Sequence, residues 1–151
     1  MIRGFFDPAR GRYPFVTLVL RVAEVNLNRW FPLEFVLDTG AEQSCLHPND
    51  AMQKMGVPSH RLDDSSTWPL AILGGGVGGG ASFYPCRAQY GFVHEDGVET
   101  LIPGAIWVAR LSATNRDLPS LLGWDVLQHF RLEIDGPNKT VSLHHRSGTS
   151  A

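Results

Sequence analysis

The stretch Phe35-Val36-Leu37-Asp38-Thr39-Gly40-Ala41 decides how this chain is interpreted. Its large apolar residues predict a buried strand, and a carboxylate follows at the end of that strand. Burying an ionised carboxylate is costly unless hydrogen bonds, a cation or a shared proton compensate. We therefore expect Asp38 in a structural turn, a metal site or a pair of carboxylates. No second Asp-Thr-Gly or Asp-Ser-Gly occurs in the sequence, so a paired carboxylate would have to come from a second copy of the chain.

The composition fits one globular domain. The chain has 151 residues, of which 43% are hydrophobic and 19% are charged. This length is enough to bury about two-thirds of the unfolded surface. We expect a single domain over residues 1–151, with a core at about 13–144 and a tail at 145–151. The 16 glycines and 10 prolines favour many short strands joined by turns, and hence a mainly β fold.

Charge and cysteine usage exclude several classes of function. The net charge is −2 and no block of like charges occurs, which argues against binding to nucleic acid or to a membrane surface. Cys45 and Cys86 form no Cys-x-x-Cys motif, and the histidines lack metal-ligand spacing, so we expect no metal and no cofactor. Residues 1–12 lack an apolar signal-peptide core, which predicts a cytoplasmic protein.

The pattern of apolar and turn residues predicts the order of elements. A short helix is expected at 48–56 and a second one at 124–130, with a loop at 57–67. The glycine cluster at 74–80 lies between two apolar arms and predicts a hairpin with a pliant tip. The predicted strands cover 15–22, 30–37, 81–92, 98–102, 105–111, 131–134 and 140–143.

Three signals follow one another in a fixed order along the chain. They are the Asp38-Thr39-Gly40-Ala41 segment, the glycine-rich hairpin, and Leu121-Leu122-Gly123-x-Asp125-x-Leu127 at the start of a helix. This ordered set resembles the retropepsin-like aspartic proteases, especially the single-lobe cellular and bacterial type similar to the protease-like domain of DNA-damage-inducible proteins. The resemblance implies a mainly β, closed-barrel lobe with two short helices, one lobe per chain, that works as a homodimer on an extended peptide or protein substrate.

The resemblance also implies roles for individual residues. Asp38 would be the catalytic carboxylate of an aspartic endopeptidase and would face its mate across a two-fold axis. Thr39, Gly40 and Ala41 would form the active-site loop and lock the dimer. The supporting strand beneath this loop would contain Leu122 and Gly123. The substrate-binding residues would be Glu42 and a flap made of Gly75, Gly76, Val77, Gly78 and Gly79.

One position departs from the family pattern. In viral members, an acidic residue two positions after the glycine pairs with an arginine after the downstream glycine. Here the equivalents are Glu42 and Trp124, so that ion pair cannot form. We expect Asp125, in the first turn of the second helix, to be structural.

Other interpretations stay open at this point. The chain could be a catalytically inactive peptide-binding dimer of the same fold. It could also be a structural β-barrel scaffold in which Asp38 is only a turn residue. The glycines Gly74, Gly76 and Gly79 match a dinucleotide-binding spacing, but Phe83-Tyr84-Pro85 disfavours the helix that such a site needs.

Overall fold

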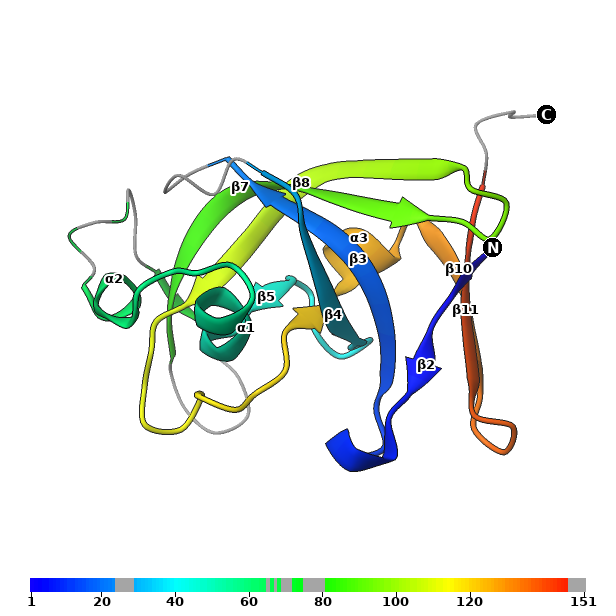
Figure 1. Cartoon of the computed structure of the whole chain (residues 1–151), viewed down its shortest axis with the longest axis horizontal. Coiled ribbons are helices and arrows are strands. Elements are labelled where there is room, and N and C mark those ends of the chain that lie inside the picture. Colours follow the sequence, from blue (N-terminus) through cyan, green and yellow to red (C-terminus); the bar gives the residue numbers. More distant parts are fainter. Residues whose placement is uncertain (24–28, 65, 67, 69–71, 75–80, 147–151) are drawn as a thin grey trace.

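The computed structural model describes residues 1–23, 29–64, 66, 68, 72–74 and 81–146 (Figure 1). Within these residues the chain is mainly β. The strands are β1 (Ile2–Arg3), β2 (Phe5–Phe6), β3 (Pro14–Val22), β4 (Phe31–Leu37), β5 (Cys45–Leu46), β6 (Ile72–Gly74), β7 (Ala81–Val93), β8 (Glu99–Ala109), β9 (Leu121–Leu122), β10 (Phe130–Asp135) and β11 (Thr140–His145). The helices are a 3-10 turn (Pro8–Arg10), α1 (Pro48–Gln53), α2 (Ser59–Asp63) and α3 (Trp124–Leu127).

Six strands close into a barrel. Their order is β3-β4-β9-β5-β8-β7, and β7 returns to pair with β3 from Val19↔Gly91 to Val22↔Ala88. The strands β2 and β6 extend this sheet beyond the barrel, β2 alongside β3 and β6 alongside β7. The prediction of a mainly β fold with a closed barrel is thereby confirmed.

Apolar side chains that point inward from the strands fill the barrel. From Val16 to Val22 along β3, every second residue is buried, which is the pattern of a strand with one face toward a core. The long strand β7 contributes two fully buried tyrosines, Tyr84 and Tyr90, to the same core. At the end of β4 the alternation stops, because Phe35, Val36 and Leu37 are all buried. The apolar run that precedes Asp38 is therefore covered on both faces.

A second, three-stranded sheet joins the two ends of the described chain. Its order is β1-β11-β10, with Ile2 opposite Leu143 and Phe130 opposite His145. In Figure 1 this sheet lies beside the barrel at the right. Ile2 and Leu143 are both buried, so the packed part of the chain starts earlier than residue 13. One isolated isoleucine in a short segment gives no periodic signal, which explains why the sequence did not predict β1.

The helices differ from the prediction in number. The structure has α1 and α3 inside the two predicted helical ranges, whereas α2 lies in the segment 57–67 that was predicted to be a loop. Five residues are too few for a 3.6-residue period to be visible. Tertiary contacts hold α2 instead: Leu62 is fully buried, Trp68 Nε1 donates to the carbonyl of Arg61 at 2.7 Å, and Tyr84 Oη donates to the carbonyl of Leu62 at 3.2 Å.

The predicted strands 98–102 and 105–111 form one continuous strand, β8. Pro103 and Gly104 were expected to separate them, but β7 pairs with β8 straight through this point. Pro103 lies where β8 has only β7 as a neighbour among the described strands, because β5 reaches β8 only at Trp107 and Val108. A missing N–H is tolerated there. None of the described helices is long and apolar enough to cross a membrane.

Candidate active site

Asp38 lies at the point where β4 ends against β9. These two strands run parallel, with Val36 opposite Leu121 and Leu37 opposite Leu122. The last bond of this ladder runs from the Asp38 N–H to the carbonyl of Leu122 at 3.0 Å. Leu122 is fully buried. The residue predicted to lie in the supporting strand therefore holds the backbone of Asp38 directly.

A tight turn orients the Asp38 carboxylate. The Gly40 N–H donates to Asp38 Oδ1 at 2.9 Å, and the Ala41 N–H donates to the Asp38 carbonyl at 3.2 Å. Asp38 is partly buried, whereas Thr39 and Gly40 are exposed. Among the described residues, none donates a hydrogen bond to Oδ2. One oxygen of the carboxylate is thus held by the loop, and the other is left for a further partner.

A carboxylate behind this turn ties the loop to α3. Asp125 Oδ1 accepts hydrogen bonds from Ser44 N at 3.0 Å and Ser44 Oγ at 2.7 Å, and its Oδ2 accepts one from Gln43 Nε2 at 2.8 Å. Ser44 Oγ in turn accepts the Gly123 N–H at 2.9 Å. Asp125 has a structural role, as expected, but it acts through these hydrogen bonds and not only through its place in the first turn of α3. Gln43 and Ser44 were not predicted, because two polar residues after a turn carry no distinctive signal.

Gly123 is required by close approach of two backbone segments. A Cβ at this position would lie 2.7 Å from the carbonyl oxygen of Ala41 and 2.9 Å from the carbonyl carbon of Gln43. Beyond Gly123, the Trp124 N–H donates to the Ala41 carbonyl at 2.8 Å and the Asp125 N–H donates to the Glu42 carbonyl at 3.0 Å. The start of α3 therefore lies directly beneath the predicted active-site loop.

Trp124, which stands where the family pattern that the sequence resembles has an arginine in viral members, contacts the same loop. Its indole Nε1 donates to the Thr39 carbonyl at 2.6 Å, and the side chain remains partly exposed. Glu42 is exposed. The indole thus anchors the loop by a hydrogen bond between two uncharged groups.

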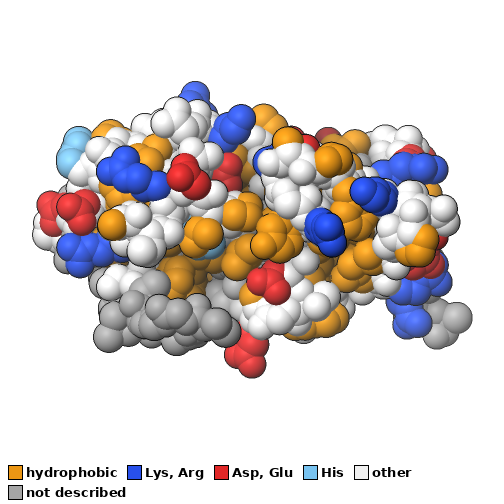
Figure 2. All heavy atoms as spheres, turned by 90° about the horizontal axis from the view of Figure 1, so that it is seen from below, with side chains coloured by type: hydrophobic (Ala, Val, Ile, Leu, Met, Phe, Trp, Pro, Cys, Tyr) orange, Lys and Arg blue, Asp and Glu red, His pale blue; other side chains and the backbone are white. Residues whose placement is uncertain are grey.

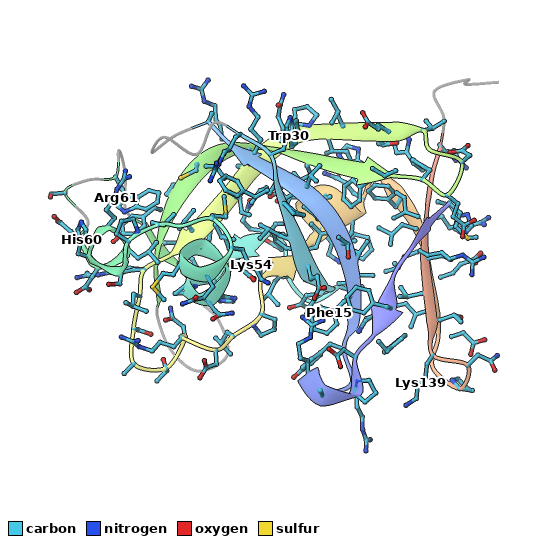
Figure 3. All side chains as sticks on the ribbon, in the orientation of Figure 1. Phe15, Trp30, Lys54, His60, Arg61 and Lys139 are labelled. Carbon is cyan, nitrogen blue, oxygen red and sulfur yellow. The ribbon has the colours of Figure 1, made fainter. Side chains whose placement is uncertain are left out.

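We predict that Trp124→Phe lowers the free energy of unfolding by about 1 kcal/mol, the usual contribution of one hydrogen bond. The phenyl ring keeps the packing but cannot donate to the Thr39 carbonyl. Urea unfolding measures the change. Trp30→Phe is the matched control, because Trp30 is similarly exposed and lies just before β4, at the other end of that strand from Asp38 (Figure 3). Equal losses in both variants would contradict the anchoring role.

An apolar pocket adjoins Asp38. Its volume is about 300 Å³. Figure 2 shows hydrophobic side chains gathered in the middle of the face seen from below, the side toward which the end of β4 points in Figure 1. The pocket is lined by Tyr13, Val36, Leu37, Asp38, His47, Leu118, Pro119 and Leu121. The pocket could hold an apolar side chain of a bound peptide, and the Asp38 carboxylate would then lie next to the backbone of that peptide.

Burial sets the protonation of two groups close to this pocket. Burial raises the pKa of the Cys45 thiol to about 12. It also lowers the pKa of His47, against the opposing effects of its hydrogen bond to Pro119 and of Asp50. His47 Nε2 lies 3.7 Å from Cys45 Sγ, so a histidine does stand beside this cysteine. The thiol nevertheless stays protonated near neutral pH, which disfavours a cysteine nucleophile.

These two shifts predict that stability falls on both sides of neutrality. Below the ordinary histidine pKa of 6.5 the unfolded chain takes up a proton before folded His47 does, so acid lowers the free energy of unfolding. Above the ordinary cysteine pKa of 9.0 the unfolded thiol ionises first, so alkali lowers it too. Urea unfolding from mildly acidic to alkaline pH measures both the acid and the alkaline decrease in the free energy of unfolding, which we call the acid limb and the alkaline limb. His47→Asn should flatten the acid limb, and an unchanged acid limb would contradict the assignment.

The flap residues Gly75, Gly76, Val77, Gly78 and Gly79 lie outside the described residues. The arms of their hairpin are described, and β6 pairs with β7 from Ile72↔Phe83 to Gly74↔Ala81. In the part of the chain that is described, no group of three or more potential metal ligands occurs.

Comparisons with known proteins find a likeness in fold. No protein-family model and no curated protein matches the chain. Among solved structures, the chain is similar to a retropepsin-like aspartic protease from Rickettsia conorii, with 21% sequence identity and a TM-score of 0.48. The match covers 94% of this chain and 88% of that one. The ordered motifs of the sequence resemble the same family.

Proposed function

We propose that this protein is an aspartic endopeptidase whose active site forms between two copies of the chain. The observation that carries the proposal is the state of the Asp38 carboxylate. One of its oxygens accepts the Gly40 N–H at 2.9 Å, and the group borders an apolar pocket. An oriented carboxylate at the edge of a pocket can act as an acid or a base.

The chemistry requires a second carboxylate. Two carboxylates about 3 Å apart repel by roughly 5 kcal/mol at an effective dielectric constant near 20, so one proton is shared between them. The ionised member takes a proton from a water molecule, and this water attacks the peptide carbonyl carbon. The protonated member donates to the carbonyl oxygen, and a proton passes to the amine as the C–N bond breaks. No covalent intermediate with the protein forms.

The supply of the second carboxylate implies a homodimer. Thr39 and Gly40 are exposed at the tip of the Asp38 turn, and Trp124 beside them is partly exposed as well. In the proposed dimer these residues meet their counterparts across a two-fold axis, with Thr39 locking the two loops. Because neither copy is active alone, we expect an obligate interface of at least roughly 2,000 Å².

The substrate is an extended peptide with an apolar side chain next to the bond that is cut. The pocket is walled mainly by apolar residues, and Tyr13 and Leu118 at its lining are half-exposed. A peptide in extended form can add to the strands around the site through its backbone. We propose that the hairpin between β6 and β7 closes over this peptide and excludes water.

The test is an inhibitor whose hydroxyl group replaces the scissile carbonyl. Such a compound mimics the tetrahedral transition state and should bind much more tightly than the matching substrate. A peptide pool is incubated with the protein at mildly acidic pH, where one shared proton is favoured, and the products are identified by mass spectrometry. We expect cleavage that the inhibitor blocks. Binding of peptides without any cleavage would favour the peptide-binding dimer, and a stable monomer would favour the scaffold.

A further inference from the structure

His47 is a buried polar side chain in the wall of the Asp38 pocket, with 8% of its surface exposed. Its Nδ1 lies 2.6 Å from the carbonyl oxygen of Pro119. A carbonyl only accepts, so Nδ1 carries the proton and neutral His47 has an acceptor at Nε2. The protonated thiol of Cys45, 3.7 Å away, is a suitable weak donor to Nε2. Both nitrogens of the ring are therefore engaged by the protein.

Two more hydrogen bonds join this region of the chain to the segment that contains Pro119. The His47 N–H donates to Ser120 Oγ at 3.0 Å, and Ser120 Oγ donates to Asp50 Oδ2 at 2.6 Å. Ser120 is fully buried, and its carbonyl accepts the Val36 N–H at 2.9 Å. Three hydrogen bonds thus join residues 47–50 to the segment Leu118–Ser120, which we call the pocket wall.

Within the pocket wall, Leu118 and Pro119 depend on these bonds because, in the described part of the chain, only Ser120 is tied to β4, through the Val36 N–H. The strand β9 begins only at Leu121, so regular pairing does not fix Leu118 and Pro119. Both of these residues line the pocket. The hydrogen bond between His47 and the Pro119 carbonyl therefore sets the distance between the pocket wall and the segment that follows β5. The depth of an apolar pocket decides which side chain fills it.

We infer that His47 is a positioning residue that fixes the pocket wall and thereby selects a large apolar substrate side chain, an inference that rests on the proposed function. Neutral imidazole is compatible with this role. Burial lowers the pKa of His47, so the ring stays neutral to a lower pH than an exposed histidine does. Two carboxylates bear on His47: Asp50, whose charge raises its pKa and which accepts the Ser120 hydroxyl, and Asp38, which lines the same pocket.

The test compares two peptides that differ only at the side chain filling the pocket, one with Phe and one with Ala. Each is made in a cleavable form and in a form with a reduced, uncleavable peptide bond. His47→Leu removes both hydrogen bonds of the ring, whereas the side-chain amide of His47→Asn can still donate toward Pro119. His60→Leu is the control, because His60 is exposed on α2 (Figure 3) and does not line the pocket.

We expect His47→Leu to reduce the preference for Phe over Ala by about tenfold, within the range of discrimination by an apolar pocket. The change should lie in KM, and in Kd for the uncleavable peptides, with kcat changed little. His47→Asn should retain most of the preference and His60→Leu all of it. If His47→Leu unfolds, Ser120→Ala replaces it, because that variant removes the second anchor of the wall.

The outcomes separate this inference from the proposed function. An unchanged Phe preference in a less stable His47→Leu protein would assign His47 to stability alone and overturn the inference. Binding with Phe preference but no cleavage by the wild type would refute the protease and leave the role of His47 intact. Nitrogen-15 NMR of the histidines gives a readout without any substrate. A proton on Nε2 of His47 instead of Nδ1 would also overturn the inference.

Discussion

Asp38→Asn is expected to abolish peptide cleavage, with a loss on the order of 10⁴-fold in kcat/KM. The amide cannot take a proton from water or share one with the opposite carboxylate. Its oxygen can still accept the Gly40 N–H, which Asp38 Oδ1 accepts at 2.9 Å. The turn and the dimer should therefore survive. Cleavage of a fluorogenic peptide measures the loss, and thermal unfolding and sedimentation measure the rest.

The matched control for this prediction is Asp96→Asn. Asp96 lies in the turn between β7 and β8, and its Oδ1 accepts the Val98 N–H at 3.0 Å. This is the same bond, from residue i+2 to the carboxylate, that Asp38 makes with Gly40. Asp96→Asn should leave cleavage unchanged. If Asp38→Asn also left it unchanged, Asp38 would be a turn residue like Asp96 and the scaffold interpretation would hold.

Gly123→Ala should lower the stability of the protein, although it adds only one methyl group. The new Cβ would lie 2.7 Å from the Ala41 carbonyl oxygen and 2.9 Å from the backbone of Gln43. Neither is a flexible side chain, so the backbone has to move. Overpacking of this kind lowers the free energy of unfolding by about 1–3 kcal/mol. Because the displaced backbone carries the Asp38 loop, we expect cleavage to fall as well.

Gly136→Ala separates crowding from the general effect of replacing glycine. Gly136 lies in the turn between β10 and β11, where a Cβ would meet no heavy atom of the described residues within 4 Å. Urea unfolding of both variants is the measurement. Similar stability of the two variants would contradict the close approach beneath the Asp38 loop. Full activity of Gly123→Ala would contradict the link between this approach and the site.

Local patterns explain how much of the fold could be predicted from the sequence. The β-branched, apolar stretch 15–22 and the apolar run before Asp38 predicted β3 and β4, and the glycine cluster between two apolar arms predicted the hairpin of β6 and β7. The parallel pairing of β4 with β9 needs contacts between residues about 85 positions apart in sequence, such as Val36 and Leu121. No periodicity within either segment specifies such a partner.

In the candidate site too, local patterns could be predicted from the sequence and long-range contacts could not. Asp38 could be singled out because a carboxylate after a buried apolar run requires compensation. The hydrogen bonds of Asp125 to Gln43 and Ser44 could not, because they arise only when α3 packs beneath the loop. His47 could not be singled out among six scattered histidines, because its link to the pocket wall is a long-range contact with Pro119.

The central claim is that two Asp38 carboxylates from different chains act together. Wild-type and Asp38→Asn chains are unfolded, mixed in equal amounts and refolded together, so that their subunits pair at random. If both carboxylates are needed, activity should be about one quarter of that of the wild type, the share of dimers that keep both. Activity of about one half would mean that each Asp38 works alone, and would contradict a site shared between two chains.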